Sequence, residues 1–236
     1  MSVYTAQDQW VWKTLFERQV ENLKGKVCEE FAAALKKMEP VLHANAIPDF
    51  RKVNDWFCGE TGWQIEVVPG LIPVADFFRL LAEKRFPSST WLRSKEQLDY
   101  LEEPDMFHDT FGHVPLLANH VFSDFMQAFG ELGCAQLHDE KKLLALQRLY
   151  WFTIEFGLLE RDQPLIYGAG IISSFGETNR AVSGTVEYRP FEMESVMNAP
   201  FRTDVVQEHY VCITGFDALF MFLKKVEEKW QQAIGV

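Results

Sequence analysis

Three side chains in two well-separated apolar segments constrain the fold of this chain more than any other feature. His108 and His113 lie in the segment PDMFHDTFGHVP (104–115), and Glu155 lies in YWFTIEFG (150–157). Two imidazoles and one carboxylate can hold one face of a non-heme ferrous ion and leave the other positions open for oxygen and a cosubstrate. If these residues bind one ion, the fold must bring the two segments into contact, and the protein is expected to be an oxygenase.

The spacing of the two histidines does not by itself indicate a metal site. Residues five apart on an ideal α-helix point about 140° apart, so His108 and His113 can converge only where the helix ends or distorts. Gly112 and Pro115 are suited to ending it, because Gly tolerates unusual dihedrals and Pro lacks a backbone donor. Two histidines so spaced are more often surface or core residues.

Glu155, like the two histidines, also has an interpretation that involves no metal. On a single α-helix over 141–156, Trp151 and Arg148 lie on the same side as Glu155. A carboxylate among apolar neighbours is costly unless it is paired or bound to a metal. An arginine such as Arg148 or Arg180 could therefore satisfy it equally well.

The pattern of the whole chain predicts a mainly α-helical protein with a few short β-strands. With 236 residues, 47% of them hydrophobic and 14% aromatic, the chain can bury a sizeable core in one domain. Apolar periodicity predicts the helices, and alternation of apolar and polar residues predicts the strands. The predicted helices cover 5–21, 27–38, 75–85, the histidine segment, 121–132, 141–156 and a stretch from Phe216, the predicted strands cover 63–67, 186–188 and 210–213, and a loop covers 45–49.

Charge and cysteine usage exclude several classes of protein. A net charge of −11 argues against a nucleic-acid or anionic-membrane partner. The four cysteines (Cys28, Cys58, Cys134 and Cys212) form no CxxC pair, and we predict that they are buried, reduced thiols of a cytoplasmic protein. The N-terminus lacks the features of a signal peptide, and no run of about 18 apolar residues predicts a membrane span.

The sequence around the three residues resembles the pterin-dependent aromatic amino acid hydroxylases. The similarity is carried by PDMFHDTFGHVPL (104–116), YWFTIEFG (150–157) and YGAGIISSFGE (167–177), which follow the family's order and distances. It runs from about Ile47 to about Ile213 and is weakest over 178–202. The chain is most similar to the short, single-domain bacterial members, which hydroxylate phenylalanine.

The resemblance implies that His108, His113 and Glu155 bind Fe(II). Tyr150 matches a residue close to the iron. Ser173 matches a serine that supports an iron-binding histidine, and it is expected in both the catalytic and the substrate-binding sets.

Substrate and cosubstrate residues follow from the same resemblance. Arg93 matches an arginine whose planar guanidinium clamps the substrate carboxylate, although without the resemblance it would be interpreted as a surface charge. Phe77 matches the aromatic on which the flat pterin ring stacks, although Phe77 and Phe78 both fit core positions and one is expected to be core. The other residues that match the amino-acid pocket are Tyr100, Pro104, Trp151, Phe156 and Gly170. The residues expected to contact the tetrahydropterin are Val68, Gly70, Leu71, Ile72, Phe77 and Asp109.

The activity implied is hydroxylation of L-phenylalanine to L-tyrosine with tetrahydropterin and O2. Residues 1–45 are expected to form an N-terminal helical segment and residues 46–236 the iron- and pterin-binding core of one catalytic domain. No regulatory domain or heptad-rich tail is expected, so allosteric activation by substrate is not expected by that route. The protein is expected to be a monomer or small homo-oligomer.

Three other functions stay open. The first is a tyrosine or tryptophan hydroxylase of the same family, although tryptophan hydroxylases typically carry a smaller aromatic at the position of Trp151. The second is a zinc hydrolase, disfavoured because no glutamate adjoins a histidine as a base. The third is a non-catalytic protein that binds pterin or an amino acid.

Overall fold

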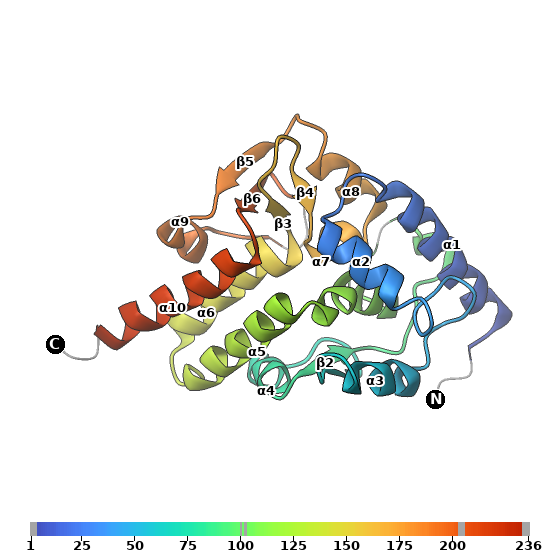
Figure 1. Ribbon diagram of the computed structural model, residues 1–236, viewed down its shortest axis with the longest axis horizontal. Coiled ribbons are helices and arrows are strands. Elements are labelled where there is room, and N and C mark those ends of the chain that lie inside the picture. The colour runs from blue at the N-terminus through green and yellow to red at the C-terminus, as the bar shows by residue number, and fades with distance from the viewer. Residues whose placement is uncertain (1–3, 100, 102, 203–205, 233–236) are drawn as a thin grey trace.

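Helices make up most of the chain in the computed structural model, which describes residues 4–99, 101, 103–202 and 206–232 (Figure 1). This confirms the predicted mainly helical class. The α-helices are α1 (Ala6–Asn22), α2 (Glu29–Lys37), α3 (Phe50–Cys58), α4 (Val74–Ala82), α5 (His120–Ala135), α6 (Glu140–Tyr150), α7 (Ala169–Ile172), α8 (Phe175–Ala181), α9 (Met193–Asn198) and α10 (Phe216–Gln232). Shorter helical turns are η1 (Lys95–Gln97), η2 (His108–His113), η3 (Pro115–Ala118) and η4 (Trp151–Glu155).

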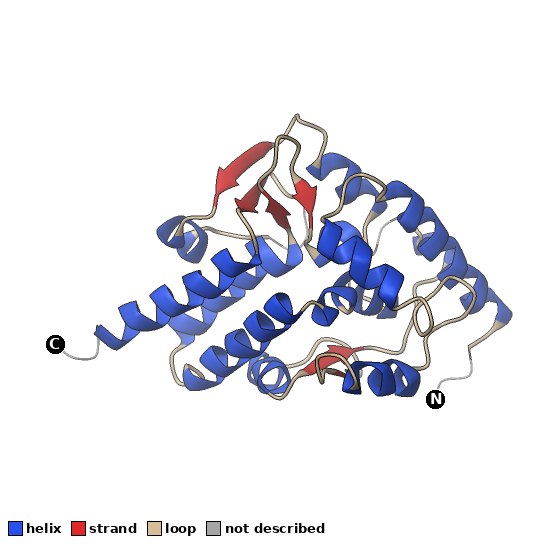
Figure 2. Ribbon diagram, viewed as in Figure 1, coloured by secondary structure: helices blue, strands red, loops and turns tan. Residues whose placement is uncertain are grey.

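The strands form two small sheets. They are β1 (Gln64–Val67), β2 (Arg85–Ser88), β3 (Gly157–Leu159), β4 (Leu165–Ile166), β5 (Glu187–Pro190) and β6 (His209–Ile213). β1 pairs with β2 in parallel, and the other sheet has the order β4-β3-β6-β5. In that sheet β6 is parallel to β3 and to β5, while β4 is antiparallel to β3. Figure 2 shows the two sheets at opposite edges of the molecule, with helices between them.

Aromatic packing fixes the histidine segment on the rest of the fold. Phe107 and Phe111 are fully buried, and their rings stack with centroids 4.8 Å apart. Trp12 of α1 meets Phe107 edge-on at 5.6 Å, and Phe16 meets Phe111 at 5.0 Å. Such aromatic contacts add stability beyond the buried area. The apolar side of η2 is therefore anchored on α1.

Several predicted elements differ from the structure. The helix predicted over 75–85 is too long, because Lys84 has a left-handed φ of 56° and Arg85 begins β2. The strand predicted over 186–188 covers Glu187–Pro190 and lies at the edge of its sheet, where Pro190 is tolerated. The elements that were not predicted are α3, α7, α8, α9, β2, β3 and β4; β3 and β4 are only three and two residues long. The predicted loop at 45–49 is confirmed.

The prediction for the cysteines is confirmed in one respect and wrong in another. All four thiols are free. Cys28 and Cys212 are buried, but Cys58, at the end of α3, is exposed. Over the described part of the chain, no helix has the length and apolar character needed to span a bilayer.

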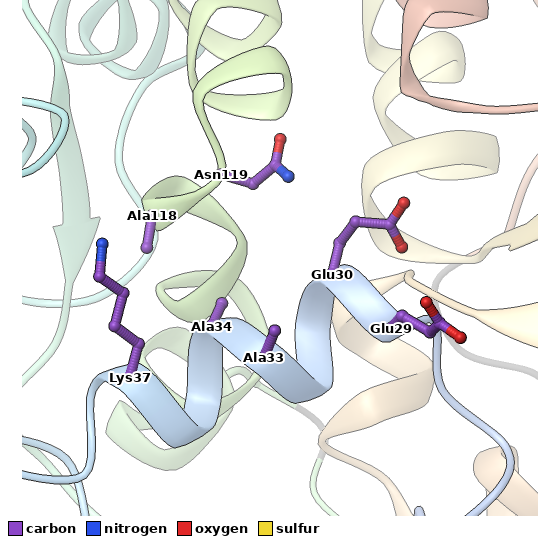
Figure 3. A pocket seen from close by; sticks show the side chains of 7 residues that line it. All are labelled: Glu29, Glu30, Ala33, Ala34, Lys37, Ala118 and Asn119. Carbon is purple, nitrogen blue, oxygen red and sulfur yellow. The ribbon is translucent and has the colours of Figure 1, made fainter.

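A shallow hollow of about 390 Å³ lies between α2 and η3. Figure 3 shows short side chains of α2, Ala33 and Ala34, facing Ala118 and Asn119 across it. Glu30 and Lys37 also border the hollow. It contains none of the predicted site residues.

Candidate active site

The two histidines and the glutamate converge as the sequence predicts. The Nε2 atoms of His108 and His113 are 3.2 Å apart. Glu155 places Oε1 3.5 Å from His108 Nε2 and Oε2 3.2 Å from His113 Nε2. Among the described residues, these three form the only group of His, Cys, Asp and Glu side chains placed to hold a metal ion.

Both segments that carry these side chains are π-helical turns. His108–His113 and Trp151–Glu155 each form a π-helix, in which the backbone bonds from residue i to i+5. Residues five apart then lie one turn apart on the same side, so His108 and His113 converge without a break in the helix. Of the two expected alternatives, the helix distorts between the histidines and does not end at Gly112, whereas the predicted continuous α-helix over 141–156 is wrong because its last turn is a π-turn. Single π-turns of this kind are frequent at functional sites.

Burial and one hydrogen bond prepare His108 as a ligand. Its Nδ1 lies 2.8 Å from the Oγ of Ser173, at the C-terminal end of α7. A proton held on Nδ1 and donated to Ser173 leaves Nε2 as a lone pair directed at the other two ligands. Burial lowers the pKa of His108 to about 4, so no proton competes with a cation for Nε2 at neutral pH.

The donor set and its dimensions fit a ferrous ion. Metal–nitrogen and metal–oxygen bonds are about 2.0–2.2 Å long, and two such bonds at a right angle separate their ligand atoms by roughly 3 Å. The three separations of 3.2–3.5 Å match that value on one face of an octahedron. Neither arginine considered as an alternative partner is needed for Glu155. Arg148 donates to the Met197 carbonyl, and Arg180 donates to the Gln207 carbonyl.

Helix α7 packs so closely on both π-turns that it needs glycine at its contact point. A Cβ atom at Gly170 would lie 2.5 Å from Oε1 of Glu155. A Cβ at Gly112 in η2 would lie 2.8 Å from the Ala169 carbonyl oxygen. The close approach of α7 therefore sets the position of the Glu155 carboxylate.

We expect Gly170→Ala to lower iron affinity by about tenfold, because the added methyl must displace the Glu155 carboxylate. Iron retention during titration with a chelator measures the effect. Gly176→Ala is the matched control, since a Cβ at Gly176 meets nothing within 4 Å. Equal iron affinity in the two variants would show that the carboxylate can move without loss of binding.

One cavity of about 1200 Å³ brings the predicted site residues together. His108, His113 and Glu155 lie in its wall. The other predicted residues that line it are Val68, Gly70, Leu71, Ile72, Phe77, Arg93, Pro104, Asp109, Tyr150, Trp151, Phe156, Gly170 and Ser173. Tyr100 lies outside the described residues. The cavity is large enough for an amino acid and a bicyclic cosubstrate together.

Arg93 is a buried residue, not a surface charge. Its side chain is 7% exposed and forms a two-pronged ion pair with Asp105, with Nε donating over 2.8 Å and Nη2 over 2.9 Å. Asp105 also accepts from the backbone N–H groups of Arg93 and His108. Burial raises the pKa of Asp105, but the hydrogen bonds and charge of Arg93 outweigh it and hold the pKa below its usual value. Asp105 thus links the arginine to the start of the histidine turn.

Asp105 was not singled out from the sequence, although a signal was present. It lies three residues before His108, where an acidic side chain commonly accepts the N–H groups at the start of a helix. Gln207 was also missed. Its Oε1 accepts the Trp151 indole N–H over 3.1 Å. The two residues are 56 positions apart, and no local pattern connects them.

The predicted pterin side of the cavity is aromatic. Phe77 is partly buried and meets the ring of Tyr150 edge-on at 5.3 Å, whereas Phe78 is 1% exposed and belongs to the core. One of the two phenylalanines is thus a core residue, as predicted. Asp109 accepts from the backbone N–H of Ser89, and burial raises the pKa of Asp109 to about 7.

Comparison with known proteins places the chain in one family. Residues 2–236 match the biopterin-dependent aromatic amino acid hydroxylases. The chain is 45% identical to the phenylalanine-4-hydroxylase of Chromobacterium violaceum over 92% of this chain and 73% of that protein. A structure of the C. violaceum enzyme with iron(III) and 7,8-dihydrobiopterin has a TM-score of 0.87 at 44% identity, covering 92% of this chain and 79% of that one. The apo structure of a cold-active phenylalanine hydroxylase from Colwellia psychrerythraea has a TM-score of 0.91 at 38% identity. The match covers 100% of this chain and 91% of that one. The chain belongs to the biopterin-dependent aromatic amino acid hydroxylase family.

Proposed function

We propose that this protein is a phenylalanine 4-monooxygenase that converts L-phenylalanine to L-tyrosine with tetrahydropterin and O2 at one Fe(II). The observation that carries the proposal is the placement of His108, His113 and Glu155 in the wall of a cavity that Arg93 and Trp151 also line. The activity of the C. violaceum relative, at 45% identity, supports the choice of substrate.

His108, His113 and Glu155 are proposed to hold the iron, and the wall formed by Phe77 and the 68–72 loop to hold the pterin. When bound, iron and tetrahydropterin together supply the reduction of O2, one atom of which enters the substrate ring. Ser173 keeps a proton on Nδ1 of His108 and so fixes the ring angle of that ligand.

The remaining residues position the substrate. Arg93 binds its carboxylate with donors that Asp105 holds in one orientation. Trp151 and Phe156, whose ring centroids are 4.7 Å apart, confine the aromatic ring beside the iron ligands and exclude water. No side chain needs to act as a strong base, because the ring proton is lost only after oxygen has been added to the ring.

Product analysis with phenylalanine, tyrosine and tryptophan, each with ferrous iron and tetrahydropterin under O2, tests the function. Tyrosine formed from phenylalanine, with the highest specificity constant of the three, is the expected result. A preference for tyrosine or tryptophan would assign another activity of the family. Activity with zinc and no need for pterin would indicate a hydrolase, and no product at full iron loading would indicate a binding protein.

Phe77→Ala is expected to raise the Michaelis constant for tetrahydropterin roughly 2- to 10-fold and to leave iron content unchanged. The substitution removes a stacking face worth about 0.5–1.5 kcal/mol but no metal ligand. Steady-state kinetics and iron analysis measure the two effects. Phe220→Ala, a change to a partly buried ring that does not line the cavity, is the control. A loss of iron with an unchanged pterin constant would assign Phe77 to packing alone.

Trp151→Phe is expected to raise the specificity constant for tryptophan relative to phenylalanine by roughly tenfold, because a smaller ring widens the pocket. Competition between the two amino acids measures the ratio. Trp10→Phe, at a position that is 52% exposed, should leave the ratio unchanged. Wild-type protein that already prefers tryptophan would refute this account of the pocket.

We further propose that the chain acts as one catalytic domain in the cytoplasm, as a monomer or small homo-oligomer and without a nucleic-acid or membrane partner. One continuous hydrophobic cluster with members from α1 to α10 supports the single domain. The four free thiols fit a reducing compartment, and the net charge of −11 disfavours polyanionic partners.

A further inference from the structure

Trp151 is held at the cavity wall by more than ring packing. Its indole lies 4.7 Å from the ring of Phe156 and 5.3 Å from the ring of Phe201. Its Nε1–H donates to Oε1 of Gln207 over 3.1 Å. A turn of the indole about its own side chain would remove this N–H from its acceptor, and leaving such a donor without a partner is costly. The hydrogen bond therefore selects one orientation of the ring.

Gln207 is itself fixed by helix α8. It is 7% exposed, and its carbonyl accepts from Arg180 Nε of α8 over 3.1 Å. Glu177, also on α8, accepts from the Tyr210 hydroxyl of β6 over 2.5 Å. Hydrogen bonds thus join α8 to β6 and to Gln207, and Gln207 to the indole at the cavity wall.

We propose that Gln207 is a positioning residue that fixes the Trp151 indole and thereby sets the choice between one-ring and two-ring aromatic amino acids. The inference rests on the proposed function, because the choice concerns substrates of that activity. Gln207 acts through Trp151 and needs no contact with the substrate. With the acceptor in place, the indole stays in the orientation that confines a benzene ring. Without it, the indole can turn aside and admit a bicyclic ring.

A double-mutant cycle on the iron-loaded enzyme tests the proposal. Gln207→Leu removes the acceptor at similar size and is expected to raise the ratio of specificity constants, tryptophan over phenylalanine, roughly tenfold. Gln207→Glu keeps an oxygen acceptor at that position and should keep the wild-type ratio. In the Trp151→Phe background no indole N–H exists, so Gln207→Leu should change the ratio less than about twofold. Should Gln207→Leu fail to fold, Gln207→Met enters the same cycle.

A purely structural role of Gln207 gives a different result. In that case, Gln207→Leu would lower the specificity constants for both amino acids together and leave their ratio unchanged. The same fall would also be seen in the Trp151→Phe background. Each of these two results overturns the proposal.

A measurement without turnover separates this inference from the proposed function. The chain has seven tryptophans, and the indole N–H resonance of Trp151 is identified by its absence in Trp151→Phe. Gln207→Leu should shift that resonance and speed its exchange with solvent, while Gln207→Glu should keep it protected. An unchanged resonance in Gln207→Leu refutes the positioning role even if phenylalanine is hydroxylated. A wild-type protein that hydroxylates nothing refutes the function and leaves this readout available.

Discussion

Replacing His113 with alanine is expected to abolish hydroxylation and iron retention together. The substitution removes one of three protein ligands, and even residues that only support a ligand change metal affinity by about 10- to 100-fold. We therefore expect iron affinity to fall by more than about 100-fold, measured by metal analysis after dialysis and by product formation at saturating iron. The loss should exceed that of Gly170→Ala, which displaces a ligand but does not delete one.

His138→Ala is the matched control for this prediction, because His138 is exposed and does not line the cavity. It should keep wild-type iron content and turnover. Full activity of His113→Ala at saturating iron would refute the assignment of the three ligands, whatever the fate of the other variants.

Arg93→Lys should lower the specificity constant for phenylalanine by roughly 10- to 150-fold, mainly through the Michaelis constant. An ammonium group cannot make paired contacts to a carboxylate, and a hydrogen bond to a charged group is worth about 1.5–3 kcal/mol. Iron content and the Michaelis constant for tetrahydropterin should stay unchanged, because Arg93 supplies no metal ligand and does not lie on the pterin wall. Steady-state kinetics with each substrate varied in turn separate these effects.

The ion pair with Asp105 requires a control for stability in the same experiment. Lysine at position 93 leaves the fully buried Asp105 with fewer donors, so some loss of thermal stability is expected in addition to the kinetic effect. Arg79→Lys, in an exposed ion pair with Asp76, should change neither the thermal stability nor the Michaelis constant for phenylalanine. A destabilised Arg93→Lys enzyme with an unchanged Michaelis constant for phenylalanine would assign Arg93 to the fold alone.

The residues that form the candidate site could be predicted from the sequence because the resemblance to the family is carried by short, specific segments. The segments 104–116, 150–157 and 167–177 do lie around one cavity. Their roles stay predictions until the variants are measured. Asp105 and Gln207 were missed for a physical reason: each acts through a partner that only the folded chain brings near, Arg93 in one case and Trp151 in the other.

The local backbone was harder to predict than the site. An apolar pattern with a period of 3.6 residues predicts α-helix and carries no mark of a π-turn, so both ligand segments were assigned the wrong helix type. β2 was not predicted because its start depends on the left-handed backbone conformation of Lys84. Residues other than glycine, asparagine and aspartate rarely adopt that conformation. α5 and α6 were found because tertiary packing and local periodicity agree over many residues there, whereas the nine-residue α3 was missed although its apolar residues also share one face.

The two π-turns relate each ligand segment to a shorter, purely α-helical version of itself. Each turn contains one residue more than an α-helical turn. Removing one residue between His108 and His113 would leave a His-x3-His pair, which an ordinary α-helix can still present on one face. Removing one residue between Trp151 and Glu155 would likewise leave an α-helical turn with the carboxylate on nearly the same side as before. Among diverging copies of such a gene, a single-codon deletion in either turn would therefore change the helix type while the ligands kept their faces.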